Sequence, residues 1–342
     1  MLAYGNGLGS VGPVAQDDDG SVWKCALLFG KGDFEQLVHW GHRSYNAKSK
    51  ICSSCDSDRA RTPWTDLRLT AAWRATTSCT HAQYLNRIDK QHPISKSPFF
   101  NKFFFRYDLM HCFDHHGISA VVAGSVLMKL VRDEHRLGDN QQARLDNINV
   151  QMKLFQNVQR PSSRMPTIRL ADLIVNEWWE LGGTLIKAAN TRQLIPFISH
   201  LAHLYFDTEG NEYHDAMKKF SKSLRDFYNV LWAAGMFLTE EELRRARADL
   251  LDLGFQHMRC RKFADDAGEL AFQIKPKAHY GQHFFEQMGL INPRHTMCYQ
   301  DESLIGVITN IYKKSCAGPY ESSVQRTVVM KYLVSWAIGQ KM

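Results

Sequence analysis

The feature that most constrains the fold is a long central region whose apolar residues recur with helical spacing. From Ile118 to Val131 they follow one another at steps of three and four residues, which gathers them on one face of an α-helix. The same spacing continues through four further segments: 140–159, 170–189, 194–206 and 214–237. The sequence therefore predicts a helix-dominated protein of the mixed α/β class, with its strands before and after this region.

One further helix is marked by its end signals. Thr239 and Glu242 form a capping box, in which the side chain of each residue bonds the backbone N–H of the other. We expect this helix to run to about Leu253, because Gly254 follows it and glycine is a typical helix terminator.

Short apolar runs predict strands on both sides of the helical region. Val22–Phe29 is bounded by glycines, Phe99–Phe105 is aromatic, and 294–299 is a third candidate. The glycine-rich residues 1–20 are expected to form a loop. Helices are expected near the end of the chain, at 302–314 and 322–338.

The composition excludes several classes of protein. The chain has 342 residues, of which 44% are hydrophobic and 23% charged, so it is not a disordered, collagenous or coiled-coil sequence. No stretch approaches the roughly 18 apolar residues of a membrane span, and the first residues do not resemble a signal peptide. We therefore expect an intracellular protein that does not enter a membrane. The net charge of +7 is compatible with a polyanionic partner.

Cys52 and Cys55 are spaced as a CxxC metal knuckle, the one close pair among eight cysteines. Zn²⁺ needs four ligands and prefers thiolate and imidazole groups. Two other pairs are candidates to complete a zinc site: His39 with His42, or Cys79 with His81. The alternative is a pair of free thiols in a polar loop. His279 and His283, one helical turn apart, also have ligand spacing, but we interpret them as residues packed against the core.

Three acidic residues stand at the ends of expected elements. Asp33 follows the first apolar run, Asp108 follows the aromatic strand, and Glu302 opens a helix. Carboxylates at such positions can converge, and they are ligands that Mg²⁺ prefers. Two such ions would stabilise the attacking and leaving oxygens of a phosphoryl displacement. With 35 acidic residues in the chain, placement alone does not separate such a site from helix caps and solvated charges.

Four segments carry a family pattern. Asp108–Gly117 reads D-L-M-H-C-F-D-H-H-G, and Met297–Gly306 reads M-C-Y-Q-D-E-S-L-I-G. Lys275–His283 reads K-P-K-A-H-Y-G-Q-H, and Ala26–Phe34 is followed by the CxxC pair. In order and approximate spacing they resemble the D-x-M-H, Y-P-x-E-R-x-L-G, P-K-x-H-x-x-x-H and strand–Asp–Phe–Pro segments of the CACTA and Plavaka-type cut-and-paste transposases.

The resemblance implies a partial ribonuclease-H-like sheet, the DDE core, interrupted by a large all-α insertion. It implies that Asp33, Asp108 and Glu302 hold Mg²⁺ or Mn²⁺. Gly306 would leave open space above the Glu302 carboxylate for metal and phosphate. Lys313 would reach DNA phosphates, although a lysine at the end of a helix also complements the helix dipole.

The role of Asp33 stays open between two topologies. If Asp33 is the second acid, Asp108 and His111 form the family's accessory D-x-x-H pair, and the first acid would lie upstream of an N-terminally truncated chain. If Asp33 is the first acid and Asp108 the second, the triad is complete, but the residues between them lack two expected strands. We favour the truncated form. His111 is then either a hydrogen-bonding partner of Asp108 or a metal ligand.

The expected organisation has four parts: a loop over 1–20, an N-terminal core part with the CxxC knuckle over 21–116, a helical insertion over 117–274 and a C-terminal core segment with an acidic helix over 275–342. We expect a transposase-derived protein of the DDE class, which the truncated form would leave inactive through loss of the first acid. If the function is retained, the protein cleaves and joins DNA phosphodiesters at transposon ends in the nucleus, and an oligomer is compatible with this function. The alternatives are a catalytically dead remnant or domesticated DNA- or protein-binding module, and an unrelated helical scaffold.

Overall fold

The computed structural model describes residues 13–16, 22–24, 30–31, 37–38, 49–88, 103, 105–184 and 186–299. Contacts between residues divide the chain into two compact units, Met1–Thr296 and Met297–Met342. The elements below belong to the first unit. The described part is dominated by helices and contains three sheets of two strands each, so the expected helix-dominated, mixed α/β character is confirmed.

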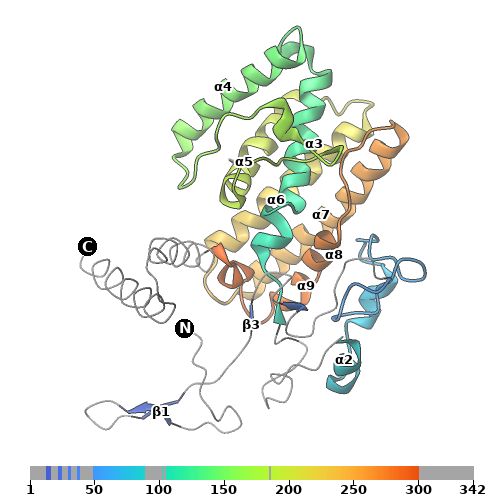
Figure 1. Cartoon of the computed structure of the whole chain (residues 1–342), viewed down its shortest axis with the longest axis vertical. Helices are drawn as coiled ribbons and strands as arrows, with labels where there is room; N and C mark the ends of the chain where they lie inside the picture. The colour runs from blue at the N-terminus through green and yellow to red at the C-terminus, as the bar shows by residue number, and fades with distance from the viewer. Residues whose placement is uncertain are drawn as a thin grey trace, which may run out of the picture. The chain divides into compact units, whose positions relative to one another are not determined.

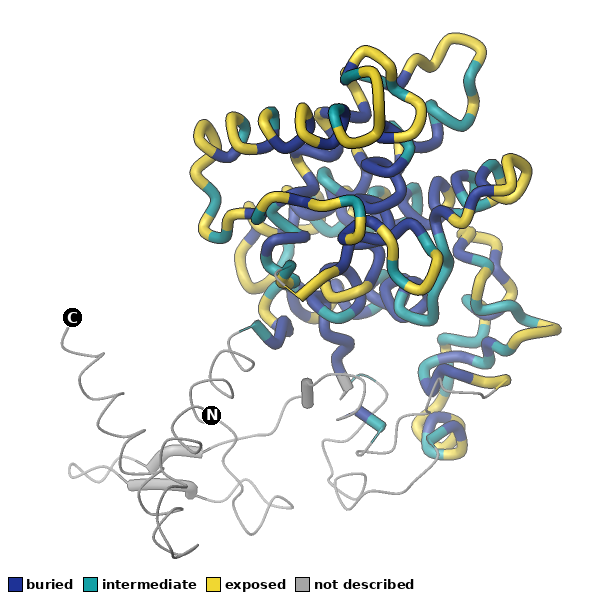
Figure 2. Tube along the Cα trace, turned by 45° about the horizontal axis from the view of Figure 1, so that its top comes forward, coloured by how far each residue is buried: buried dark blue, intermediate teal, exposed yellow. Residues whose placement is uncertain are grey.

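Helix α3 (Ile118–Asp133) forms the centre of the helical part (Figure 1). Thirteen of its 16 residues are buried, on every side of the helix, as is typical of a helix inside a core. The neighbours α5 (Ala188–Tyr205) and α6 (Glu212–Ala233) pack against it, and α4 (Gln141–Gln159) covers it from the periphery. Figure 2 shows this buried centre and the exposed outer side of α4.

Helix α7 (Glu240–Asp266) packs along α6 and begins with the expected capping box at Thr239. The expected end at Leu253 is wrong, because the helix continues through Gly254. A Cβ atom at Gly254 would lie 2.8 Å from the carbonyl oxygen of Leu67. This glycine therefore permits a close approach of the neighbouring loop rather than ending the helix.

The prediction of a helix over 170–189 is also wrong. Its first part forms a 3₁₀ turn, η5 (Leu170–Leu173), and a hairpin of β5 (Ile174–Val175) and β6 (Trp178–Trp179). Asn176 and Glu177 connect the two strands with positive φ angles of 47° and 71°, the geometry of a tight two-residue hairpin turn. The extended strand lets the N–H of Trp179 bond the carbonyl of Leu270 at 2.7 Å, a tertiary partner that sequence periodicity does not reveal.

Two further sheets join segments before the helical region. Strand β1 (Pro13–Gln16) pairs with β2 (Val22–Lys24) in antiparallel register, so the expected loop over 1–20 contains a strand. Strand β3 (Gly30–Lys31) pairs in parallel with β4 (Phe105–Arg106). The strands β2 and β4 fall within or next to the two apolar runs expected as strands; the rest of those runs lies mostly outside the described residues.

The strand expected over 294–299 is instead a 3₁₀ turn, η6 (Pro293–Thr296). Its geometry is set by Asn292, whose side-chain oxygen accepts the N–H of Arg294 at 3.1 Å. The remaining elements are η1 (Ala72–Thr76), α2 (His81–Arg87), the π-helical turn η3 (Met110–Asp114), η4 (His135–Leu137), α8 (Pro276–Gln282) and α9 (Phe284–Gln287). The helices expected at 302–314 and 322–338 lie outside the described residues. No described helix combines the length and apolar character that crossing a membrane requires.

Candidate metal centre

The CxxC pair lies in a compact loop that hydrogen bonds hold in shape. Arg87, which is buried, donates to the carbonyl oxygens of Ser54 and Thr76 and forms an ion pair with Asp56 at 2.7 Å. The thiol of Cys52 accepts the N–H of Ser54 at 3.3 Å. The loop backbone is therefore fixed from both sides, and both thiols are fully buried.

Two histidines reach this loop from α8 and the residue that follows it. His279 and His283 are one turn apart, so their side chains lie on the same face of the chain. The hydroxyl of Tyr280 donates to the carbonyl of Ile51 at 2.7 Å and ties this helix to the loop. On the opposite side, Gly281 lets α8 approach the core closely, because a Cβ atom there would lie 3.0 Å from the ring of Phe113.

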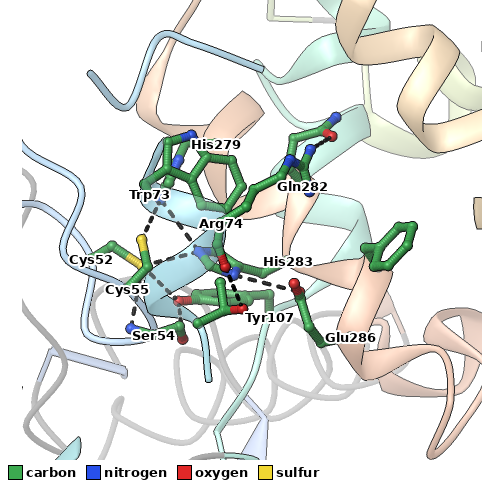
Figure 3. Close-up of polar contacts among 12 residues, drawn as sticks. Cys52, Ser54, Cys55, Trp73, Arg74, Tyr107, His279, Gln282, His283 and Glu286 are labelled. Carbon is green, nitrogen blue, oxygen red and sulfur yellow. Dashed lines mark hydrogen bonds and ion pairs between the residues drawn. The ribbon is translucent and has the colours of Figure 1, made fainter. Parts of the chain in front are cut away.

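The four side chains converge on one buried point (Figure 3). Cys52 Sγ lies 3.3 Å from His283 Nε2, and Cys55 Sγ lies 3.3 Å from His279 Nε2. The two Nε2 atoms are also 3.3 Å apart. All four ligand atoms lie within 4.8 Å of one another. This cluster of Cys52, Cys55, His279 and His283 is called the Cys2His2 cluster below.

These distances fit the edges of a tetrahedron around a metal ion. Bonds of about 2.3 Å to sulfur and about 2.0 Å to nitrogen give edges of roughly 3.5 Å between sulfur and nitrogen and roughly 3.3 Å between two nitrogens. Two thiols and two imidazoles are a donor set that Zn²⁺ prefers. The Cys2His2 cluster could therefore hold a metal ion such as Zn²⁺.

The ligand groups also shift one another's pKa values. Burial acts to raise the pKa of Cys52, but its hydrogen bond with Cys55 and the charge of His283 act against burial and bring that pKa well below its usual value. Burial acts to lower the pKa of His283, but the Cys52 thiolate raises it to about 9. Burial raises the pKa of Cys55 well above its usual value. The pKa of Cys52 thus falls and that of His283 rises because each group favours the charged form of the other.

Aromatic rings and a carboxylate surround the cluster. The ring of Trp73 lies edge-on to His279, with 4.5 Å between the ring centroids, and Tyr107 stacks on His283 at 5.7 Å. His283 Nδ1 faces Glu286 Oε2 at 3.6 Å, the side on which a metal-bound histidine commonly meets a carboxylate. These neighbours exclude water from the cluster and restrict the orientation of the His283 ring.

No family model, curated protein or solved structure matches this chain. The geometry of the described residues is therefore what bears on function.

The structure corrects the predicted ligand set. Cys52 and Cys55 do come together, but the described residues that complete the site are not the predicted ones. Cys79 and His81 are not part of the cluster, and His39 and His42 lie outside the described residues. The missing ligands are the pair that we interpreted as core packing, His279 and His283. Their i, i+4 spacing was a usable signal, but more than 220 residues separate them from the cysteines.

Of the predicted acidic residues, only Asp108 lies in the described part. It is buried, and its carboxylate accepts the N–H of Met110 at 3.0 Å and bonds His111 Nδ1. His111 is thus a hydrogen-bonding partner of Asp108. Its other predicted role, as a metal ligand, stays a prediction. The pair stands at the start of η3, and π-helical turns are frequent at functional sites. Asp33, Glu302, Gly306 and Lys313 lie outside the described residues.

Proposed function

We propose that the Cys2His2 cluster binds a structural zinc ion. The observation that carries the proposal is the convergence of four buried ligand atoms at tetrahedral spacing. Four protein ligands leave no position for water or substrate, which is the pattern of structural rather than catalytic zinc. The ion would join the loop that precedes η1 to α8, two segments that lie far apart in the chain, with 223 residues between Cys55 and His279.

Metal analysis of the purified protein tests this proposal. We expect about one zinc per chain, and a cobalt-substituted protein should show the visible absorption of tetrahedral cobalt with thiolate ligands. Cys55→Ala should abolish the cobalt spectrum. Cys260→Ala is the matched control, because Cys260 is equally buried but lies on α7 away from the cluster. Absence of a stoichiometric metal, or equal loss in both variants, would refute the proposal.

We further propose that the chain derives from a DDE transposase and acts on DNA phosphodiesters with Mg²⁺ or Mn²⁺. Support comes from the resemblance of its motifs and from the parallel pairing of β3 with β4, in which Lys31 faces Arg106. In the sequence, Asp33 follows Lys31 by two positions and Asp108 follows Arg106 by two. Two carboxylates that follow neighbouring parallel strands in the sequence suit the two-metal site of the ribonuclease-H-like core that the resemblance implies.

A nicking assay on supercoiled DNA tests this second proposal. If Asp33 and Asp108 complete the triad, Mn²⁺ or Mg²⁺ should support cleavage that Glu302→Ala abolishes and that Asp139→Asn, a change of an exposed acid, leaves intact. The truncated form predicts no cleavage. Cleavage that is equal in both variants would contradict the proposal. DNA binding without cleavage would favour the inactive or domesticated form, and neither activity would favour a helical scaffold. We propose action at transposon ends in the nucleus only for the catalytically active form.

A further inference from the structure

Helix α4 presents an outward face of unusual composition. Val150, Leu154 and Val158 recur every four residues and are 57%, 61% and 79% exposed, so they form one apolar stripe. The opposite face of α4 is buried against the core, as Figure 2 shows. The stripe is therefore separate from the buried face that packs α4 against the core.

The polar residues around the stripe are mostly uncharged. Within the 19 residues of α4 there are three charged side chains, and one of them, Arg144, is buried and bonds backbone carbonyls. The surroundings of the stripe are largely glutamine and asparagine. Helix α7, in contrast, carries charged residues along its length. Solvated helix faces are usually rich in charge, and a contiguous apolar stripe in an amide-rich surface is typical of a surface that contacts another protein.

The charges at the two ends of the stripe are opposite. Asp146 is exposed one turn before Val150, and its carboxylate bonds only a neutral side chain among its described contacts, Gln142 at 2.9 Å. Arg160 is exposed just after the last turn of α4, two residues beyond Val158. An antiparallel copy of the same helix would place the Asp146 end of each stripe against the Arg160 end of the other.

We propose that the chain forms a homodimer by antiparallel packing of α4 against α4 of a second copy, centred on Leu154. A two-fold axis through this point makes the stripe complementary to itself and forms the contact between Asp146 and Arg160 twice. The contact area of one helix face is below that of a standard stable interface, so the dimer is expected to dissociate readily on dilution.

Sedimentation of the full chain over a range of concentrations tests the proposal. We expect a concentration-dependent dimer whose dissociation constant rises tenfold or more in Leu154→Asp. Leu69→Asp is the matched control, because Leu69 is 62% exposed but lies in the loop before η1, and it should dimerise as the unchanged chain does. A chain that stays monomeric at the highest concentration reached, or a dimer that Leu154→Asp does not weaken, would overturn the proposal.

Charge reversal tests the antiparallel arrangement separately. Asp146→Arg and Arg160→Asp should each weaken the dimer, because each places two like charges together, and the double variant should restore it. If the interface does not pair these two residues, combining the two substitutions should not recover the affinity that each one loses. Failure of the double variant to recover the dimer would therefore refute the antiparallel packing.

Discussion

The hydroxyl of Tyr107 lies 3.5 Å from the sulfur of Cys52, although 55 residues separate them in the chain. The same hydroxyl lies 2.9 Å from the hydroxyl of Ser54, and the residue after Tyr107 is Asp108. Tyr107 thus connects the Cys2His2 cluster with Asp108, which precedes the π-helical turn η3 and bonds His111 within it.

From this contact we expect Tyr107→Phe to lower the zinc affinity of the cluster about tenfold. Groups that bond a metal ligand orient it, and their loss typically weakens binding by about 10- to 100-fold. Competition against a chromophoric chelator measures the affinity. Tyr205→Phe is a control, because the hydroxyl of Tyr205, on α5, bonds the side chain of Gln151 at 2.8 Å rather than a ligand of the cluster. An unchanged affinity in Tyr107→Phe would contradict a role in holding Cys52.

Gly124→Ala should destabilise the protein strongly. A Cβ atom at Gly124 would lie 2.3 Å from the backbone carbon of Glu180 and 2.3 Å from the backbone nitrogen of Leu181, so α3 and the segment after β6 would have to separate. Overpacking of this kind costs about 3 kcal/mol. Urea unfolding measures the cost. In Gly235→Ala the nearest atom would be 4.0 Å away, and we expect a change below about 1 kcal/mol. Equal losses in both variants would show that contact with Glu180 and Leu181 is not the cause.

Tyr228→Phe should lower the free energy of unfolding by about 2 kcal/mol. The buried carboxylate of Asp114 accepts the hydroxyl of Tyr228 and, at 3.2 Å, that of Ser119. Removal of one donor leaves a buried charge short of a hydrogen bond, and bonds to charged groups contribute about 1.5 to 3 kcal/mol. Chemical denaturation measures this loss. In Tyr205→Phe, where the lost partner is the neutral side chain of Gln151, a smaller effect is expected.

His257 should make the protein less stable as the pH falls from about 6.5 to 4. This histidine is buried, and burial lowers its pKa to about 4, whereas an unfolded chain has a histidine pKa of about 6.5. Between these values the unfolded chain binds a proton that the folded chain does not, so unfolding becomes easier by up to roughly 1.4 kcal/mol per pH unit. His257→Gln should show a shallower loss of stability over this range in urea unfolding. Both proteins keep the Cys2His2 cluster, so the difference between their slopes of unfolding free energy against pH reports on His257 alone. Identical slopes would contradict the prediction.

The helical elements were the most predictable part of the fold. Helices α3 and α4 lie where the periodicity of apolar residues places them, because that periodicity reflects the side of the helix that is buried. The expectation failed at 170–189, where a hairpin forms with partners such as Leu270 from far along the chain. It failed again at Gly254, because a glycine that permits close packing and one that ends a helix look the same in the sequence.

The sequence by itself determined the helical character of the chain and the CxxC half of its metal site, since both depend on residues close together along the chain. Only the tertiary structure decided that His279 and His283, rather than the nearer Cys79 and His81, complete that site. Ligand spacing of two or four residues is a local property, whereas the union of the two halves requires α8 to pack against the loop that holds Cys52. That packing depends on contacts such as the one between Tyr280 and Ile51, which no local pattern encodes.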